Sequence, residues 1–277
     1  MRLVAYRDDD GTGGGGTAVG RLEGTLVHRL RGVDRIDRTT PARALREAEA
    51  DPEGVELAGL TLLPVAHPGK VFCVGLNYRS HVAETGRELP TYPVLFPKFA
   101  SNLVGHGAPI TLPPESAQVD YEAELAVVIG EGGRRIAREA AFDHVLGYTI
   151  ANDVTMRDYQ YRTHQWTQGK AWDDSTPLGP VLVTADELDP GKLDIELRLN
   201  GRQMQSANTD RLIFDIPELV AVVSEFTRLE PGDVILTGTP GGVGFRRDPQ
   251  VFLADGDVVE VEVEGIGTLR NTVRAEA

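Results

Sequence analysis

The stretch Asp120-Tyr121-Glu122-Ala123-Glu124-Leu125-Ala126-Val127-Val128-Ile129 places two glutamates directly before five apolar residues. Its composition predicts a strand over 121–129. Because side chains two positions apart on a strand share a face, Glu122 and Glu124 should point together, about 7 Å apart at the backbone. Ala126 and Val128 continue that face toward the interior. Carboxylates that lose hydration there are expected to take up a proton or bind a cation. An edge strand with solvated glutamates is the alternative.

A third carboxylate, Asp153, follows the apolar strand predicted over 145–151. The end of a buried strand beside polar residues is a common place for a ligand-binding side chain. Three carboxylates without a His or Cys partner suit a hard octahedral ion, Mg²⁺ or Mn²⁺, that keeps positions open for water or substrate. The predicted metal ligands are therefore Glu122, Glu124 and Asp153, and this set disfavours zinc.

Two further segments carry side chains suited to catalysis. Lys170 ends the segment Gln165-Trp166-Thr167-Gln168-Gly169-Lys170 and could stabilise an enolate or a carboxylate beside a metal, or be a surface lysine. If residues 77–84 include a short helix, His81 and Glu84 are neighbours at positions i and i+3. Glu84 could then orient the imidazole so that His81 takes a proton from water. A solvated His–Glu pair is the competing interpretation.

Two glycine-rich segments could bind anions through their backbone. Thr237–Gly244 follows a strand predicted over 234–237, and its N–H groups could hold a carboxylate. It lacks the Lys-Ser/Thr pair of a nucleotide-binding P-loop, which excludes ATP and GTP. The run Gly11–Gly16 lacks the same pair and predicts a flexible hairpin tip.

The composition limits the possible partners and the compartment. The 277-residue chain carries 28 Lys and Arg against 42 Asp and Glu, a net charge of −14 at pH 7. This balance argues against nucleic acid and anionic membranes as partners. Cys73 is the single cysteine, so no internal disulfide can form and a reducing compartment is expected. No apolar run approaches the roughly 18 residues of a membrane span, and no signal-peptide pattern opens the chain. A soluble, cytoplasmic protein is expected.

The chain divides into two predicted parts. Residues 1–66 should form a small N-terminal α+β domain, with strands at 3–6, 19–22 and 25–29, a helix from Thr40 to about Ala50 and a linker over 59–68. Residues 67–277 should form a β-rich catalytic domain whose clearest helix spans 216–227, begun by Asp215 and Glu218. Its expected strands are 71–74, 94–98, 121–129, 145–151, 180–183, 194–199, 234–237 and 258–263, with a hairpin turn at Asn200-Gly201. Strands without alternating helices indicate a β-rich α+β fold.

Taken together, these segments resemble the fumarylacetoacetate hydrolase family, in particular its acylpyruvate hydrolase and 2-hydroxyhepta-2,4-diene-1,7-dioate isomerase-like members. The resemblance covers about residues 67–270 and is carried, in chain order, by Lys70–Tyr78 leading to His81, Asp120–Leu125, Asn152–Asp158, Gln165–Lys170 and Thr237–Gly244. It implies a β-roll-like catalytic domain, usually a homodimer, that binds Mg²⁺ or Mn²⁺. The N-terminal glycine run departs from the family pattern.

The resemblance also implies roles for individual residues. Glu122, Glu124 and Asp153 match the family's metal ligands, and Lys170 matches its substrate-side lysine. His81 and Glu84 match its water-activating pair. The residues expected to bind substrate are Arg157, Gln160 and Thr239, the last as part of a carboxylate-binding loop.

The reaction that the resemblance implies is metal-dependent hydrolysis of a carbon–carbon bond in an acylpyruvate-like 1,3-diketo acid. The ion would polarise two oxygens of this small anionic keto-acid substrate, His81 would deprotonate the attacking water, and Lys170 would stabilise the leaving enolate. An oxaloacetate decarboxylase, or an isomerase or tautomerase of 2-hydroxy-diene acids, could use the same site. A non-catalytic binding protein is disfavoured because these residues occur together. Specificity is expected from the loop Thr85–Pro93, which could close over the site.

Overall fold

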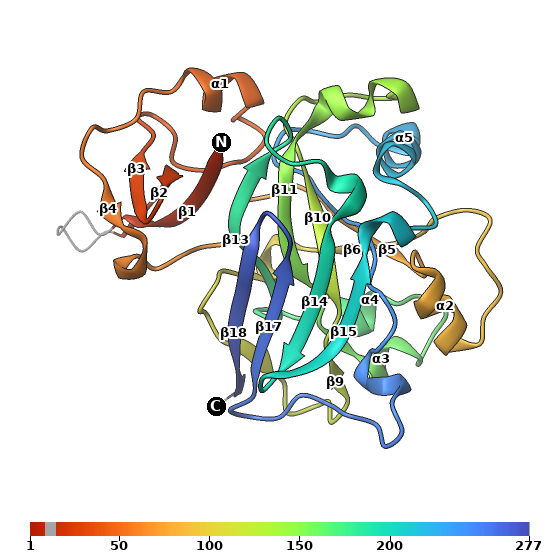
Figure 1. The fold of residues 1–277 in the computed structure, drawn as a ribbon. Helices are drawn as coiled ribbons and strands as arrows, with labels where there is room; N and C mark the ends of the chain where they lie inside the picture. Colours follow the sequence, from red (N-terminus) through yellow and green to blue (C-terminus); the bar gives the residue numbers. More distant parts are fainter. Residues whose placement is uncertain (9–14, 277) are drawn as a thin grey trace.

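The computed structural model describes residues 1–8 and 15–276, so most of the predicted hairpin tip at Gly11–Gly16 lies outside the described residues. Figure 1 shows a large twisted sheet with a smaller sheet in front of it and the N-terminal strands at one side. Across the described residues, the spatial order of the large sheet is β4 (Val55–Glu56), β3 (Leu26–Arg29), β2 (Gly16–Glu23), β1 (Arg2–Asp8), β13 (Thr176–Thr184), β11 (Val145–Asn152), β10 (Ala123–Ile129), β16 (Val234–Leu236), β5 (Val71–Gly75) and β6 (Val94–Lys98), with β7 (Leu103–Val104) beside β13.

A smaller sheet covers one face of the large one. In the described part of the chain its order is β15 (Arg202–Asn208), β14 (Asp194–Leu199), β17 (Val258–Val263), β18 (Gly267–Ala275) and β8 (Ile110–Leu112), and a separate ribbon pairs β12 (Thr155–Met156) with β9 (Val119–Asp120). Strands β14, β17 and β18 contact β10, β11 and β13. The predicted turn at Asn200-Gly201 joins β14 to β15, and both residues have positive φ, 53° and 78°. Glycine and asparagine adopt this conformation most readily, which explains the tight hairpin.

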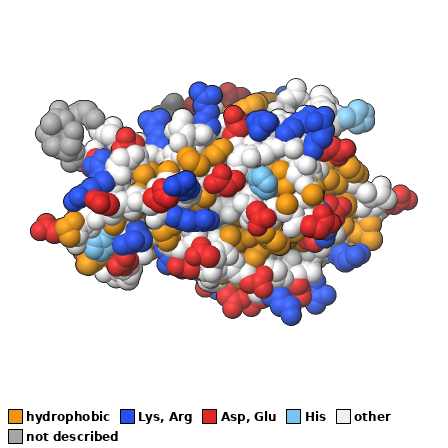
Figure 2. All heavy atoms as spheres, turned by 90° about the horizontal axis from the view of Figure 1, so that it is seen from above, with side chains coloured by type: hydrophobic (Ala, Val, Ile, Leu, Met, Phe, Trp, Pro, Cys, Tyr) orange, Lys and Arg blue, Asp and Glu red, His pale blue; other side chains and the backbone are white. Residues whose placement is uncertain are grey.

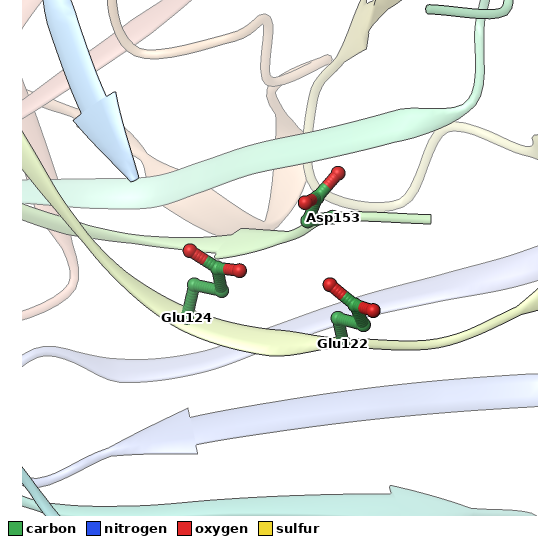
Figure 3. Close-up of side chains that lie close together, drawn as sticks. All are labelled: Glu122, Glu124 and Asp153. Atoms are coloured by element: carbon green, nitrogen blue, oxygen red, sulfur yellow. The ribbon is translucent and has the colours of Figure 1, made fainter. Parts of the chain in front are cut away.

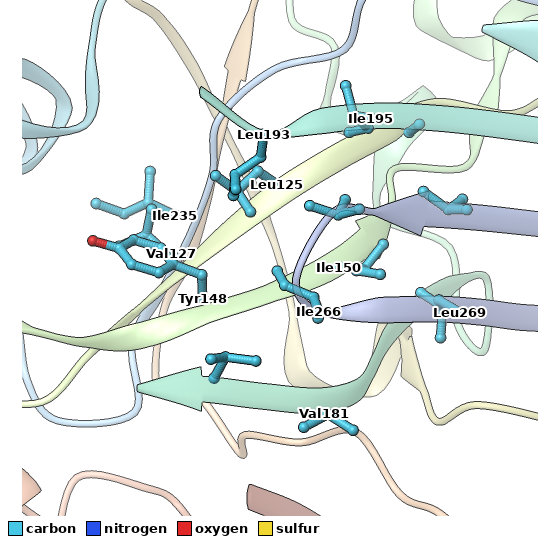
Figure 4. Packing of buried hydrophobic residues seen from close by; sticks show 14 of the residues in the cluster. Leu125, Val127, Tyr148, Ile150, Val181, Leu193, Ile195, Ile235, Ile266 and Leu269 are labelled. Atoms are coloured by element: carbon cyan, nitrogen blue, oxygen red, sulfur yellow. The ribbon is translucent and has the colours of Figure 1, made fainter. Parts of the chain in front are cut away.

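Strand β10 carries the two glutamates toward the interior because its side chains alternate between two cores. Leu125 and Val127 point into the core between the two sheets (Figure 4). Ala126 and Val128 belong to a second core on the other face of the large sheet. Glu124 has the same parity as Ala126, so the predicted alternation is confirmed. β10 is buried along its whole length between β11 and β16, and the edge-strand alternative is therefore wrong.

The helices are few and lie outside the sheets. In the described chain the α-helices are α1 (Ala42–Glu47), α2 (Arg79–Thr85), α3 (Arg157–Gln160), α4 (Thr167–Lys170) and α5 (Ile216–Phe226), and the other helical segments are short 3-10 turns. The helix predicted over 216–227 is confirmed, and the Asp215 side chain accepts a hydrogen bond from the Glu218 amide at 3.0 Å. The prediction that Thr40 caps the N-terminal helix is wrong. The Thr40 hydroxyl instead donates to the Arg35 carbonyl at 2.8 Å, and α1 begins after Pro41.

The N-terminal strands continue the large sheet. β1 pairs with β13 in antiparallel register, with Leu3 opposite Leu182. Leu45 of α1 belongs to the second core together with Val128. The N-terminal segment and the β-rich part of the chain therefore share a sheet and a core. The boundary near residue 66 stays a prediction.

The surface is strongly charged. On the face shown in Figure 2, acidic and basic side chains are intermixed around apolar ones, so the net charge of −14 is not gathered into one acidic patch on this face. Among residues 1–8 and 15–276, no helix has both the length and the apolar character needed to cross a bilayer.

Candidate metal centre and active site

Three carboxylates meet where β10 begins and β11 ends (Figure 3). Ala123 pairs with Asn152 in the antiparallel register of these strands, which brings Glu122 opposite Asp153. The Asp153 amide donates to the Glu122 carbonyl at 2.9 Å. One oxygen from each of Glu122, Glu124 and Asp153 lies within 4.8 Å of the other two, and all three side chains are buried. Strand register therefore brings the predicted ligand set together.

Three buried cations surround this carboxylate group. Lys170 Nζ lies 2.7 Å from Glu122 Oε2 and 2.8 Å from Asp153 Oδ2. On the other side of Asp153, Lys98 Nζ lies 2.9 Å from Oδ1. Arg157 Nη2 lies 2.7 Å from Glu122 Oε1. Lys170 is only 2% exposed, so the surface-lysine alternative is wrong.

The pKa values of the two glutamates are shifted in opposite directions. Burial alone would raise the pKa of Glu122, but Lys170 and Arg157 lower it to about 2. Burial, Asp153 and Glu122 raise the pKa of Glu124 well above its ordinary value. Among the described residues no cationic side chain lies within 4.0 Å of Glu124, whose Oε2 accepts a hydrogen bond from the Gly238 amide at 2.6 Å. A divalent cation would cancel this repulsion, so the three hard oxygen donors fit Mg²⁺ or Mn²⁺.

Helix α2 presents the His–Glu pair to the same pocket. It spans Arg79–Thr85, which confirms the predicted short helix. His81 Nδ1 lies 2.7 Å from Glu84 Oε1. His81 is buried and lines the pocket together with Glu122, so the solvated-pair interpretation is wrong. Because Nδ1 faces Glu84, Nε2 is the ring nitrogen left to exchange a proton with a substrate.

The glycine-rich loop Thr237–Gly244 holds the protein's own carboxylates. The Gly238 amide donates to Glu124, the Gly242 amide to Glu84 Oε2 at 2.7 Å, and the Gly244 amide to Asp120 Oδ1 at 2.8 Å. These three amides therefore serve the protein's own carboxylates, and binding of a substrate carboxylate by Thr239 and the rest of the loop stays a prediction. Buried carboxylates need hydrogen-bond donors, and the loop supplies them.

The predicted substrate-binding residues line one pocket, which encloses about 490 Å³ including its open mouth. Arg157 Nη1 donates to Gln160 Oε1 at 3.0 Å, and Thr239 Oγ1 accepts from Gln205 Nε2 at 2.8 Å. Thr85, at the start of the predicted specificity loop, also lines the pocket. Contact between these residues and a substrate stays a prediction.

Three buried residues of the site were missed by the sequence reasoning. Asp120 accepts a hydrogen bond from Arg157 Nε at 2.8 Å, and its two-residue spacing from Glu122 could have identified it. Lys98 ends β6 and carries no such signal. Gln205 lies on β15, a strand that was not predicted, and its Oε1 accepts a hydrogen bond from the Ala123 amide at 2.9 Å.

Comparison with known proteins agrees with this fold and this arrangement of carboxylates. The family model described as fumarylacetoacetate (FAA) hydrolase C-terminal matches residues 70–274. The fold and the site together define a β-rich α+β enzyme with a buried group of carboxylates. The chain belongs to the fumarylacetoacetate hydrolase family.

Several similar proteins have names that state an activity. The chain is 42% identical to the human mitochondrial oxaloacetate tautomerase FAHD2A, over 99% of this chain and 91% of the relative. It is 40% identical to the mitochondrial oxaloacetate tautomerase fahd2 of Xenopus laevis, over 99% and 90%. Among solved structures, 2-hydroxyhepta-2,4-diene-1,7-dioate isomerase from Mycobacterium marinum superposes with a TM-score of 0.83 at 35% identity, covering 100% of this chain and 99% of that one. Fumarylacetoacetate hydrolase from Exiguobacterium antarcticum superposes with a TM-score of 0.84 at 36% identity, covering 100% of both.

Proposed function

We propose that this protein is a metal-dependent tautomerase that interconverts the enol and keto forms of a β-keto acid of the oxaloacetate type. The observation that carries the proposal is the buried group of Glu122, Glu124 and Asp153, with Lys170 and the His81–Glu84 pair beside it. The names of the relatives favour tautomerisation over the carbon–carbon hydrolysis expected from the sequence.

Each group in the pocket has a role in moving one proton between carbon and oxygen. Glu122, Glu124 and Asp153 would hold a Mg²⁺ or Mn²⁺ ion, which when bound polarises the 2-oxo group of the substrate. In the enol-to-keto direction the 2-hydroxyl releases its proton to solvent water, and His81 Nε2 gives a proton to carbon 3 and is reprotonated from solvent. Glu84 keeps the imidazole oriented and stabilises its charged form. The Lys170 ammonium stabilises the negative charge that develops on the substrate's 2-oxygen.

The product distinguishes tautomerisation from the other reactions that this site could perform. Purified protein with Mn²⁺ should accelerate the loss of enol-oxaloacetate absorbance without forming pyruvate. Pyruvate formed from oxaloacetate would instead indicate decarboxylation. Hydrolysis is the second candidate, because the His81–Glu84 pair is suited to activating water. Release of pyruvate from acylpyruvates at a higher kcat/KM than the enol reaction would establish hydrolysis and overturn the proposal.

His81→Ala is expected to slow the enol–keto conversion by about 100- to 10,000-fold, the usual contribution of a positioned acid–base group. Affinity for Mn²⁺ should stay unchanged, because His81 is not among the proposed ligands. Stopped-flow absorbance and calorimetric Mn²⁺ titration measure the two quantities. His164→Ala is the matched control, because His164 is exposed and does not line the pocket. A wild-type rate in His81→Ala would remove this residue from the reaction.

The proposal also includes the assembly and the compartment. The homodimer implied by the family resemblance is tested by light scattering of the full chain. The cytoplasmic location expected from the sequence is part of the same proposal, and the curated relatives from Homo sapiens and Xenopus laevis are named as mitochondrial.

A further inference from the structure

Two arginines at the pocket mouth have no role in holding the carboxylates. Arg87 and Arg246 both line the pocket and are exposed. Among the described residues, Arg157 and Lys170 of this pocket form ion pairs with its carboxylates, whereas neither Arg87 nor Arg246 forms an ion pair. In a chain of net charge −14, Arg87 and Arg246 place positive charge at the lining of this pocket.

Each rim arginine is held in place by its surroundings. Gly86 ends α2 in the left-handed conformation, with φ of 66°, and turns the chain so that the Arg87 guanidinium lies 5.5 Å from the Trp166 ring centroid. Trp166 packs against Phe96 with ring centroids 5.7 Å apart, and Lys170 Nζ lies 4.9 Å from the centroid of the Phe96 ring. This series of contacts links Arg87 at the mouth to the Lys170 ammonium at the base.

Arg246 has similar surroundings. The Arg246 guanidinium lies 5.1 Å from the Phe245 ring centroid, and Phe245 stacks on Tyr161 with centroids 5.4 Å apart. The Phe245 amide donates to Asp120 Oδ2 at 3.0 Å, so the backbone next to Arg246 is anchored to the carboxylate that also holds Arg157. Both arginines therefore lie against aromatic side chains that also line the pocket.

The charges at the base of the pocket show why the rim arginines are needed. The buried carboxylates Asp120, Glu122, Glu124 and Asp153 face the buried cations Lys98, Arg157 and Lys170. With all of them ionised, this group carries one net negative charge, and a bound divalent ion would turn it into one net positive charge. That charge is balanced by a single carboxylate at the reacting end of the substrate. A second carboxylate would find no countercharge at the base of the pocket.

We infer that Arg87 and Arg246 bind the distal carboxylate of the substrate, so that the enzyme selects 2-oxo dicarboxylates over 2-oxo acids with an uncharged tail. The inference rests on the proposed function and names the residues that determine its substrate class. Planar guanidinium groups suit a carboxylate because they donate two parallel hydrogen bonds to it. The aromatic side chains hold the guanidinium groups but supply no countercharge of their own.

The inference is tested by comparing the binding of two 2-oxo acids, with no catalytic reaction being measured. 2-Oxoglutarate and 2-oxovalerate have the same carbon count and differ in a terminal carboxylate against a terminal methyl group. Their dissociation constants are measured calorimetrically on Mn²⁺-loaded protein. Arg87→Gln and Arg246→Gln should each raise the dissociation constant of 2-oxoglutarate about fivefold, as expected for an exposed ion pair worth about 1 kcal/mol. The double variant should raise it about 25-fold. Binding of 2-oxovalerate and of Mn²⁺ alone should change less than twofold, and Arg87→Lys should recover part of the loss.

The control and the outcomes separate this inference from the proposed function. Arg79→Gln makes the same charge change at an exposed residue that begins α2 and does not line the pocket, and it should leave the binding of both ligands unchanged. The inference is overturned if the double variant binds both ligands more weakly by the same factor, or if it binds both as tightly as the wild type. A wild-type protein that binds both ligands as expected but does not catalyse the enol–keto reaction overturns the proposed function and leaves the role of the rim arginines standing.

Discussion

Replacing Glu122 by Gln is expected to reduce the rate of the Mg²⁺- or Mn²⁺-supported reaction by at least about 100-fold. Mutating a residue that only hydrogen-bonds to a metal ligand costs up to about 100-fold, and Glu122 is a proposed ligand itself. The substitution removes one of three converging carboxylate charges and leaves Lys170 and Arg157 with one partner fewer. Initial rates across a Mn²⁺ titration measure the loss. Glu225→Gln is the matched control, because Glu225 is exposed on α5 and does not line the pocket.

A companion variant separates loss of the ion from loss of the fold. Glu124 contacts no cationic side chain in the described chain, so Glu124→Gln removes repulsion from Asp153 and Glu122 without leaving a buried cation unpaired. The metal-free melting temperature of this variant should equal or exceed that of the wild type, while its Mn²⁺ affinity falls. If either variant keeps wild-type activity in the presence of a chelator, the metal-dependent account is wrong.

The second large effect concerns stability. Lys98→Met is expected to lower the free energy of unfolding by about 3–5 kcal/mol, the usual cost of removing one partner from a buried ion pair. The Lys98 ammonium lies against Asp153 and donates hydrogen bonds to the Val154 carbonyl at 3.0 Å and to Thr176 Oγ1 at 2.8 Å. Methionine fills a similar volume, so the lost charge and hydrogen bonds account for the change.

Urea unfolding of metal-free protein measures this loss. Lys192→Met is the control, because Lys192 is exposed and makes no ion pair in the described residues, and it should stay within about 0.5 kcal/mol of the wild type. A change below about 1 kcal/mol for Lys98→Met would show that the buried ammonium does not stabilise the fold.

The parts of the site that the sequence predicted are those governed by local geometry. Glu122 and Glu124 share a face because strand side chains alternate, and His81 meets Glu84 because residues three apart are neighbours on a helix. Asp153 joins them through the end of a buried strand that happens to be the antiparallel neighbour of β10. These relations depend on spacing along the chain or on one strand pairing.

The parts that were missed depend on contacts between distant segments. Lys98 meets Asp153 only after β6 and β11 take their places in the large sheet, and in the sequence it resembles any lysine at a strand end. The Gly242 and Gly244 amides donate to Glu84 and Asp120, which lie far from the loop in the sequence, so spacing along the chain could not indicate these contacts. The helix predicted from Thr40 to about Ala50 is shorter in the structure. Thr40 uses its hydroxyl on the Arg35 carbonyl rather than as a cap, and the backbone is already extended at Ala48, with ψ of 130°.

Crystals grown with Mn²⁺ and oxalate, which presents adjacent carboxylate oxygens and no carbon to protonate, test the metal centre most directly. The account predicts one anomalous manganese peak bonded, at about 2.1 Å, to an oxygen from each of Glu122, Glu124 and Asp153, with two oxalate oxygens and one water completing the octahedral coordination. A structure in which the Lys170 ammonium still bridges Glu122 and Asp153, and the manganese peak lies elsewhere, would contradict it.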